Sequence, residues 1–208
     1  MSALVLRPFL AVASKSPGRG RDRAGAARRP EGVAAEPPLD PGEARRFREA
    51  LLPHLDAAYG FARMLTRDPT AAEDLVQEAY LKAYRSFRGY RGGDAKAWLF
   101  SILRTSFISQ ARRGGRFPDL AAEAAEEVPD PGDTPEAALV REGDGAAVRA
   151  AVEALPDTFR EAIVLREEEE MSYRQIAEVT ATPIGTVMSR LARARRLLAA
   201  ALAGENRP

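Results

Sequence analysis

Two short helical patterns separated by a tight break dominate the C-terminal part of the chain. Ser172 stands where an N-cap of the first helix is expected, and Thr182 with Pro183 marks the start of the second, because proline costs nothing at the first helical position. Apolar residues of the second pattern recur at three- and four-residue steps: Ile184, Val187, Leu191, Ala194 and Leu198. The patterns predict two helices joined by a turn, the second over residues 182–198 with one buried face.

The opposite face of the second predicted helix carries hydroxyl and guanidinium groups. Its members are Thr186, Ser189, Arg190, Arg193 and Arg196. Arginine forks onto guanine edges or phosphates, and short hydroxyls reach backbone oxygens without blocking close approach, so this face suits the major groove of DNA. The alternative is an ordinary solvated helix face. The two marked helix starts and the short break between them favour a helix-turn-helix whose second helix reads DNA.

Charge is segregated along the chain, although its total is nearly balanced. The 208 residues hold 31 Lys and Arg against 30 Asp and Glu, a net charge of +1 that does not by itself indicate a nucleic-acid partner. The sequence has no cysteine, which excludes disulfides, thiol catalysis and cysteine-ligated zinc. No apolar run approaches the roughly 20 residues of a membrane span. We therefore expect a cytoplasmic protein without membrane insertion.

Two segments lack the composition of a folded domain. Residues 1–41 are rich in Pro, Gly, Ala and Arg without a helical stripe, which predicts a disordered basic arm that adds phosphate affinity, or else a dispensable tail. Residues 115–145 are acidic and interrupted by prolines, which predicts a flexible linker. The predicted fold is therefore all-α, with two small helical domains at 42–114 and 146–203 and a tail at 204–208.

The first predicted domain begins with two helical patterns. An apolar stripe between Phe47 and Leu65 predicts an amphipathic helix that Pro53 kinks or restarts. Thr70 and Glu73 are spaced as a capping box, which predicts the start of a second helix. The outer side of that second helix carries Asp74, Gln77 and Glu78. Taken by themselves these three residues form a solvated face.

Aromatic and basic residues alternate in the loop and the third helix that follow. They are Arg88, Tyr90, Arg91, Trp98, Arg104, Arg112 and Arg113. Such a combination can stack unpaired bases and follow their phosphates. The alternative is a core position, which is favoured for Trp98. His54 is the sole histidine and has no metal-ligand companions, and no catalytic constellation, metal site or cofactor site is recognisable, so we expect a non-enzyme.

Two of these stretches carry a family resemblance. Asp74-Leu75-Val76-Gln77-Glu78 and residues 183–191 resemble the two motifs of the extracytoplasmic-function sigma factors, the small two-domain initiation subunits of bacterial RNA polymerase. The resemblance covers residues 43–113 and 146–202, in the order and spacing of the family. Two motifs at the right separation are far more specific than either alone.

The resemblance implies a role for each predicted surface. Asp74, Gln77 and Glu78 would dock onto core RNA polymerase. The third helix and its preceding loop would open the minus-ten element of promoter DNA, and the helix-turn-helix would read the minus-thirty-five element, with Thr182 and Met188 added to its contacts. The family is commonly held inactive by an anti-sigma factor, so a cognate inhibitor is a further implied partner of a chain that is monomeric when free.

Four positions depart from the family pattern. Thr105 and Ser109 stand in the third helix where the family usually has an amide or a carboxylate, so the contacts that they make with the minus-ten strand are expected to differ. Glu170 and Ala181 replace glycines, and an alanine in a left-handed turn costs about 1 kcal/mol.

Two other functions compete with the sigma-factor interpretation. A stand-alone helix-turn-helix regulator would normally dimerise to match its half-sites, but the chain shows no heptad seam and its first domain would be unexplained. An enzyme hidden in the first domain would have to use Asp74, Glu78 or His54, whose spacing suggests no site.

Overall fold

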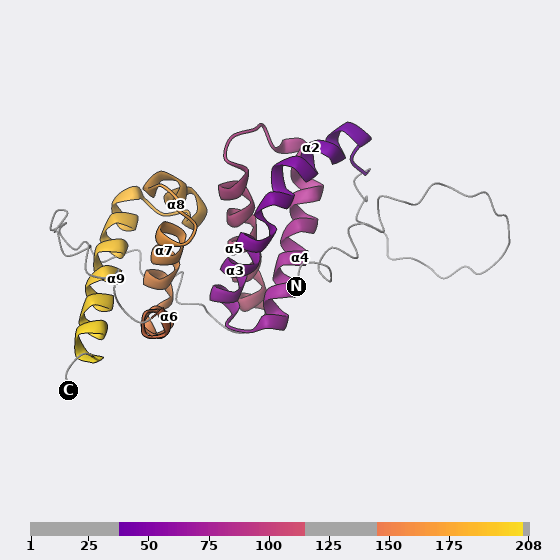
Figure 1. Cartoon of the computed structure of the whole chain (residues 1–208). Helices are drawn as coiled ribbons and strands as arrows, with labels where there is room; N and C mark the ends of the chain where they lie inside the picture. The colour runs from indigo at the N-terminus through magenta and orange to yellow at the C-terminus, as the bar shows by residue number, and fades with distance from the viewer. Residues whose placement is uncertain (1–37, 115–144, 206–208) are drawn as a thin grey trace, which may run out of the picture.

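The computed structural model describes residues 38–114 and 145–205, and every regular element within them is helical (Figure 1). The first domain comprises α2 (Pro41–Leu51), η1 (Leu52–His54), α3 (Leu55–Thr66), α4 (Pro69–Ser86), η2 (Phe87–Gly89) and α5 (Ala95–Arg113). The second comprises α6 (Gly145–Ala154), α7 (Asp157–Glu167), α8 (Tyr173–Thr180) and α9 (Ile184–Glu205). The predicted all-α fold with two small helical domains is confirmed. The predicted linker and nearly all of the predicted arm lie outside the described residues.

The start of α4 differs from its prediction. The predicted capping box at Thr70 and Glu73 is wrong, because α4 begins at Pro69 and its N-cap is Asp68. The Asp68 carboxylate accepts a hydrogen bond from the Ala71 N–H at 2.7 Å. An aspartate followed by a proline supplies both a cap and a favourable first helical residue. The break that Pro53 predicts is confirmed, since the short turn η1 separates α2 from α3.

The first domain is held together by apolar residues of α2 to α5. Phe61 of α3 and Phe100 of α5 are fully buried, and their ring centroids lie 4.8 Å apart. The Tyr80 hydroxyl donates to the Leu51 carbonyl at 2.8 Å, which ties α4 to the end of α2. Burial raises the pKa of Tyr80. This core fixes the positions of α4 and of α5, the two helices that carry the predicted surfaces.

In the second domain α9 packs against α7 and α8. Val187, Leu191, Ala194 and Leu198 are buried as predicted. Ile184 is not, because it is the first residue of α9 and its side chain is 50% exposed. The helix begins at Ile184, one residue after Pro183, its predicted first helical position. The Thr182 hydroxyl lies 2.8 Å from that of Thr180.

The backbone is left-handed at two positions that flank α8. Ser172 caps α8 in a capping box with Gln175, which confirms its predicted role. Ala181, at the C-terminal end of α8, has φ 52°. Glu170, three residues before the first residue of α8, has φ 55°. Both values lie in the left-handed region that favours glycine.

Ala181→Gly should therefore stabilise the protein by about 1 kcal/mol, because it removes the cost of the left-handed alanine. Chemical denaturation followed by circular dichroism measures this change. Ala177→Gly, inside α8, is the matched control and should destabilise by about 1 kcal/mol. Destabilisation by both substitutions would show that Ala181 is not strained.

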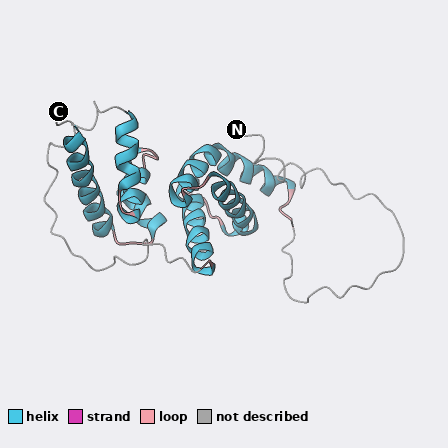
Figure 2. Ribbon diagram, turned by 90° about the horizontal axis from the view of Figure 1, so that it is seen from below, coloured by secondary structure: helices cyan, strands magenta, loops and turns pink. Residues whose placement is uncertain are grey.

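The two domains lie side by side (Figures 1 and 2) and contact each other through α5 with α8 and α3 with α7. Arg104 of α5 pairs with Glu161 of α7 at 2.7 Å, and Lys96 of α5 pairs with Glu169 at 2.7 Å. A more exposed pair joins Arg67 to Asp157 at 3.0 Å. We call this packing of the domains the closed arrangement.

Candidate nucleic-acid interface

The outer face of α9 retains most of the predicted DNA contacts. Met188 is 40% exposed, and Arg193 and Arg196 are exposed. Thr182, Thr186 and Ser189 are partly exposed. Hydroxyls and two arginines thus remain accessible along the first four turns of the helix.

The structure corrects the prediction that Arg190 lies on the outer face of α9. Arg190 is only 6% exposed, because it follows the buried Val187 by three residues and precedes the buried Ala194 by four, so it lies on the core side of α9. Burial raises the pKa of the Glu161 carboxyl on α7, and the positive charge of Arg190 acts against that rise. Placing Arg190 on the outer face was therefore wrong, and its charge serves the interior of the domain.

Glu161 lies between arginines from both domains. Its side chain is fully buried, and its Oε1 accepts a hydrogen bond from Nε of Arg104 at 2.7 Å. Burial raises the pKa of Glu161, and the charges of Arg104 and Arg190 act against that rise. Arg104, a predicted minus-ten contact, is 7% exposed in the closed arrangement. The second domain thus covers it.

The loop before α5 is organised by packed aromatic rings. The Tyr90 ring lies 4.8 Å from that of Trp98 and 5.6 Å from that of Phe87, measured between centroids. The Tyr90 hydroxyl donates to the Gly93 carbonyl at 2.8 Å. Tyr90 and Trp98 are both partly exposed, so their rings pack on the core and still border solvent. The expectation of Trp98 as a simple core residue is therefore only half correct.

Thr105 and Ser109 occupy successive turns of α5. The Thr105 hydroxyl donates to the Ser101 carbonyl at 2.7 Å, and that of Ser109 donates to the Thr105 carbonyl at 2.8 Å. Each hydroxyl proton is thus used inside the helix. The oxygen atoms remain acceptors, which suits contacts with base amino groups better than contacts with phosphates.

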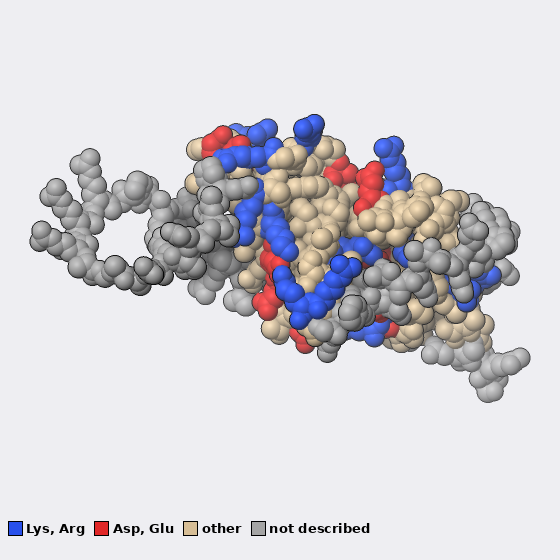
Figure 3. Space-filling model, turned by 180° about the vertical axis from the view of Figure 1, so that it is seen from behind, with Lys and Arg blue, Asp and Glu red and all other residues tan. Residues whose placement is uncertain are grey.

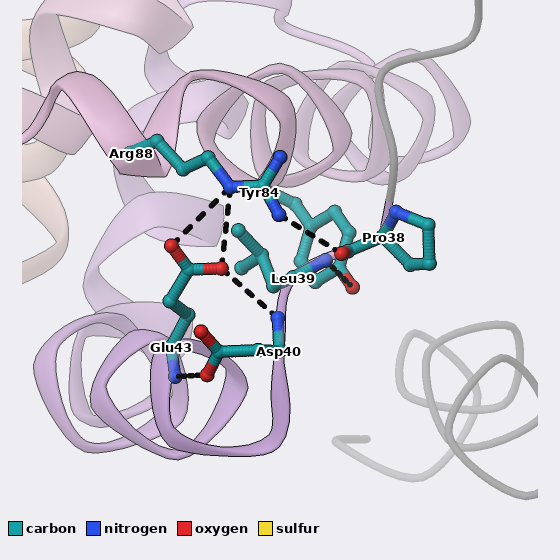
Figure 4. Close-up of polar contacts among 6 residues, drawn as sticks. All are labelled: Pro38, Leu39, Asp40, Glu43, Tyr84 and Arg88. Atoms are coloured by element: carbon teal, nitrogen blue, oxygen red, sulfur yellow. Dashed lines mark hydrogen bonds and ion pairs between the residues drawn. The ribbon is translucent and has the colours of Figure 1, made fainter.

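Arg88 has a structural partner (Figure 4). Its Nε lies 3.2 Å from both carboxylate oxygens of Glu43, and its Nη2 donates to the Pro38 carbonyl at 3.0 Å. Glu43 also belongs to the capping box of α2, in which Asp40 is the N-cap. These contacts anchor the start of α2 to η2, the turn that follows α4. A backbone hydrogen bond and the Arg88 contact lower the pKa of Glu43.

Three other predicted basic contacts are accessible to a polyanion. Arg91, Arg112 and Arg113 are exposed. In the view from behind, Lys and Arg side chains gather in a band across the first domain (Figure 3). Arg113 lies 3.8 Å from Glu78 with 68% of its side chain exposed, a pair that contributes little in water.

The outer side of α4 contains an apolar residue that the sequence analysis missed. Asp74 is exposed, while Gln77 and Glu78 are partly exposed. Leu81 follows Glu78 by three residues on the same side and is 49% exposed. We call these four residues the α4 face. The sequence contained a sign of this exposure: Leu81 follows Glu78 by three residues and Asp74 by seven, which places it on the same polar side of α4, away from the core.

Glu78 also has a role inside the domain. It pairs with Lys82 at 2.6 Å and accepts a hydrogen bond from Gln110 of α5. The Lys82 hydrogen bond lowers the pKa of Glu78. The carboxylate therefore helps to hold α4 against α5, unlike Asp74.

His54 provides a pH-dependent contribution to stability. Burial and the nearby Lys96 lower its pKa, although Asp94 and Glu169 act in the opposite direction. The unfolded chain therefore binds the proton more tightly than the folded one, and stability should fall as the pH drops below about 6.5. Denaturation at pH 7.5 and pH 5.5 should show a smaller difference for His54→Asn than for the natural chain. An unchanged difference would assign the pH dependence to carboxyl groups.

Within residues 38–114 and 145–205, no set of three or more metal-ligating side chains is clustered. None of the helices in the same residues combines the length and the hydropathy of a transmembrane segment.

Comparisons with known proteins match both domains. The family model for sigma-70 region 2 matches residues 51–117, and that for sigma-70 region 4 matches residues 145–198. The chain is 35% identical to the RNA polymerase sigma-H factor of Pseudomonas aeruginosa, over 77% of this chain and 88% of that protein. It is 38% identical to the ECF RNA polymerase sigma-E factor of Haemophilus influenzae, over 60% of this chain and 71% of that protein.

A solved structure shares the fold. It is the sigma factor RpoE of Bartonella quintana in complex with the anti-sigma factor NepR, with a TM-score of 0.59 and 33% sequence identity. The match covers 78% of this chain and 99% of the RpoE chain.

Proposed function

This chain belongs to the extracytoplasmic-function sigma factors, which direct bacterial RNA polymerase to specific promoters, and from that membership we propose a distinct role for each of three surfaces. The α4 face docks onto core polymerase. The loop before α5, with α5 itself, captures the melted minus-ten element, and α9 reads the minus-thirty-five element. The observation that carries the proposal is the presence of a DNA-suited helix in each of two separate domains.

The minus-ten role rests on the ring cluster of Tyr90 and Trp98. Partly exposed rings that are held by packing offer a stacking surface for an unpaired base, and each stacked base is worth about 1–3 kcal/mol. The exposed Arg91, Arg112 and Arg113 supply phosphate contacts on the same domain. Unstacking a base costs a few kcal/mol, which these contacts offset. Melting therefore needs capture of bases and no covalent chemistry.

The minus-thirty-five role rests on the accessible side of α9. Ser189, Arg193 and Arg196 lie on it, and arginine and hydroxyl groups suit the major groove and its phosphates. Arg190 is left out of this set because it is buried.

The polymerase role rests on the composition of the α4 face. An exposed leucine bordered by Asp74, Gln77 and Glu78 has the composition of a protein interface, with an apolar centre and a polar rim. Leu81 is exposed without serving the core of its own domain.

The two DNA readers act together only after the domains separate. In the closed arrangement α8 packs against α5 and Arg104 is covered by the second domain. Docking on polymerase would hold the separated domains at a high effective concentration near their two promoter elements. The closed arrangement is then the form of the free, monomeric chain.

The same proposal implies an inhibitory protein partner and leaves catalysis to the polymerase. Because the related RpoE forms a complex with the anti-sigma factor NepR, we expect an anti-sigma factor to bind this chain. Polymerase supplies the catalysis, so the chain is a non-enzyme that needs no metal or cofactor. It acts in the cytoplasm, where polymerase and promoter DNA are found.

Selection from a random duplex library tests the proposal. The complex of this chain with core polymerase should enrich two sequence elements at a fixed spacing, whereas core polymerase alone or the chain alone should enrich neither. Enrichment of one symmetric element by the chain alone would contradict the proposal and favour a stand-alone dimeric regulator.

A further inference from the structure

The N-terminal end of α9 exposes two large apolar side chains. Ile184 is 50% exposed and Met188 is 40% exposed, and the two lie one turn apart on the same side of the helix. Neither fills the core of the second domain. They therefore border whatever partner approaches the first turns of α9.

Gly185, between them, indicates that this partner comes close to the helix backbone. Glycine inside a helix costs about 1 kcal/mol relative to alanine. A Cβ at Gly185 would meet no atom within 4 Å, and the residue has no positive φ. Neither packing nor backbone conformation thus requires a glycine there. With Ser189 and Ala192 at steps of four and three, it forms a strip of small side chains.

The surrounding groups identify the partner as DNA. Thr186 and Ser189 are partly exposed, and Arg193 and Arg196 are exposed, which suits a polyanion with a groove. The first residues of a recognition helix meet base edges. The only apolar group on a base edge in the major groove is the C5-methyl of thymine. Because Arg190 is buried, this end of α9 offers no arginine fork to guanine.

Building on the proposed function, we propose that Met188 and Ile184 read thymine methyl groups, so that A·T pairs occupy the positions of the minus-thirty-five element that face the first turns of α9. The small side chains of Gly185, Ser189 and Ala192 beside them let α9 approach the floor of the major groove closely enough for these contacts. Sequence preference at these positions then comes from apolar contact, and preference further along the helix comes from Arg193 and Arg196.

Replacing thymine by uracil tests this proposal, because it removes the methyl group and leaves base pairing unchanged. The chain–core polymerase complex binds duplexes of the selected minus-thirty-five element with single thymine-to-uracil changes. At one or two positions the affinity should fall about fourfold, the loss expected for one methyl-sized apolar contact. At the position that Met188 contacts, Met188→Ala should bind the thymine and uracil duplexes equally. Leu197→Ala, 39% exposed on the same helix, should keep the full thymine preference.

The possible failures are distinguishable. If every uracil duplex binds as well as its parent while the element is still selected, methyl reading is wrong and the proposed function stands. If no element is selected at all, the proposed function itself fails. Gly185→Ala gives an independent readout: it should stabilise the free chain and yet weaken binding to the thymine duplex at least threefold. Unchanged DNA affinity in that variant would overturn the close approach.

Discussion

Arg104→Ala is expected to separate the two domains of the free chain. Arg104 and Glu161 pair at 2.7 Å, with side chains that are 9% and 0% exposed. Removing one partner of a buried ion pair costs about 3–5 kcal/mol; here the buried carboxylate of Glu161 loses the arginine that is hydrogen-bonded to its Oε1 and keeps only the charge of Arg190 nearby. That loss corresponds to a shift of roughly 100-fold or more in the ratio of closed to separated molecules.

Single-molecule energy transfer measures this shift directly. The chain has no cysteine, so cysteines introduced at the exposed Arg85 and Ala199 carry the two dyes without competition. The natural sequence should show a higher transfer efficiency than Arg104→Ala, because separation of the domains moves the two dyes apart. Arg67→Ala is the matched control, because its pair with Asp157 is 61% and 36% exposed and contributes about 1 kcal/mol at most. Unchanged high transfer in Arg104→Ala would show that this pair does not hold the domains together.

Leu81→Ala is expected to weaken binding to core polymerase about thirtyfold. This is the loss of roughly 2 kcal/mol that is typical when an apolar anchor at the centre of an interface is truncated. Since Leu81 is 49% exposed in the free chain, the substitution should leave the free energy of unfolding nearly unchanged. Titration of labelled chain with core polymerase gives the affinity, and denaturation gives the stability.

Two comparisons make the Leu81 result specific. Leu197→Ala removes a leucine of similar exposure on the second domain, 39%, and should bind core polymerase normally. Asp74→Ala combined with Gln77→Ala removes polar neighbours of Leu81 and should weaken binding as well. Normal binding by Leu81→Ala would place the polymerase contact on another surface.

Local sequence signals predicted the fold well because they determine local structure. Ser172 with Gln175 caps α8, and the apolar spacing from Val187 to Leu198 gives the buried side of α9. Pro53 separates α2 from α3. Where two local signals competed, as at Asp68 and Thr70, the earlier cap with its following proline prevailed.

The candidate site was less predictable because burial depends on distant parts of the chain. The spacing of Arg190 from Val187 and Ala194 indicates the core side of α9, but it does not reveal Glu161 on α7, the acidic group near the buried guanidinium. Arg88 is occupied by Glu43, 45 residues away in the sequence. Nor does any motif reveal the closed arrangement, since Arg104 and Glu161 are 57 residues apart and lie on different domains.

The most direct test of the central claim is run-off transcription from fragmented genomic DNA with core RNA polymerase and the purified chain. Sequencing the 5′ ends of the RNA shows where synthesis begins. We predict defined starts that are absent with core polymerase alone, each preceded by the same two elements at a fixed spacing. Starts identical to those of core polymerase alone, from a chain that binds the polymerase and is folded, would contradict its role in promoter recognition.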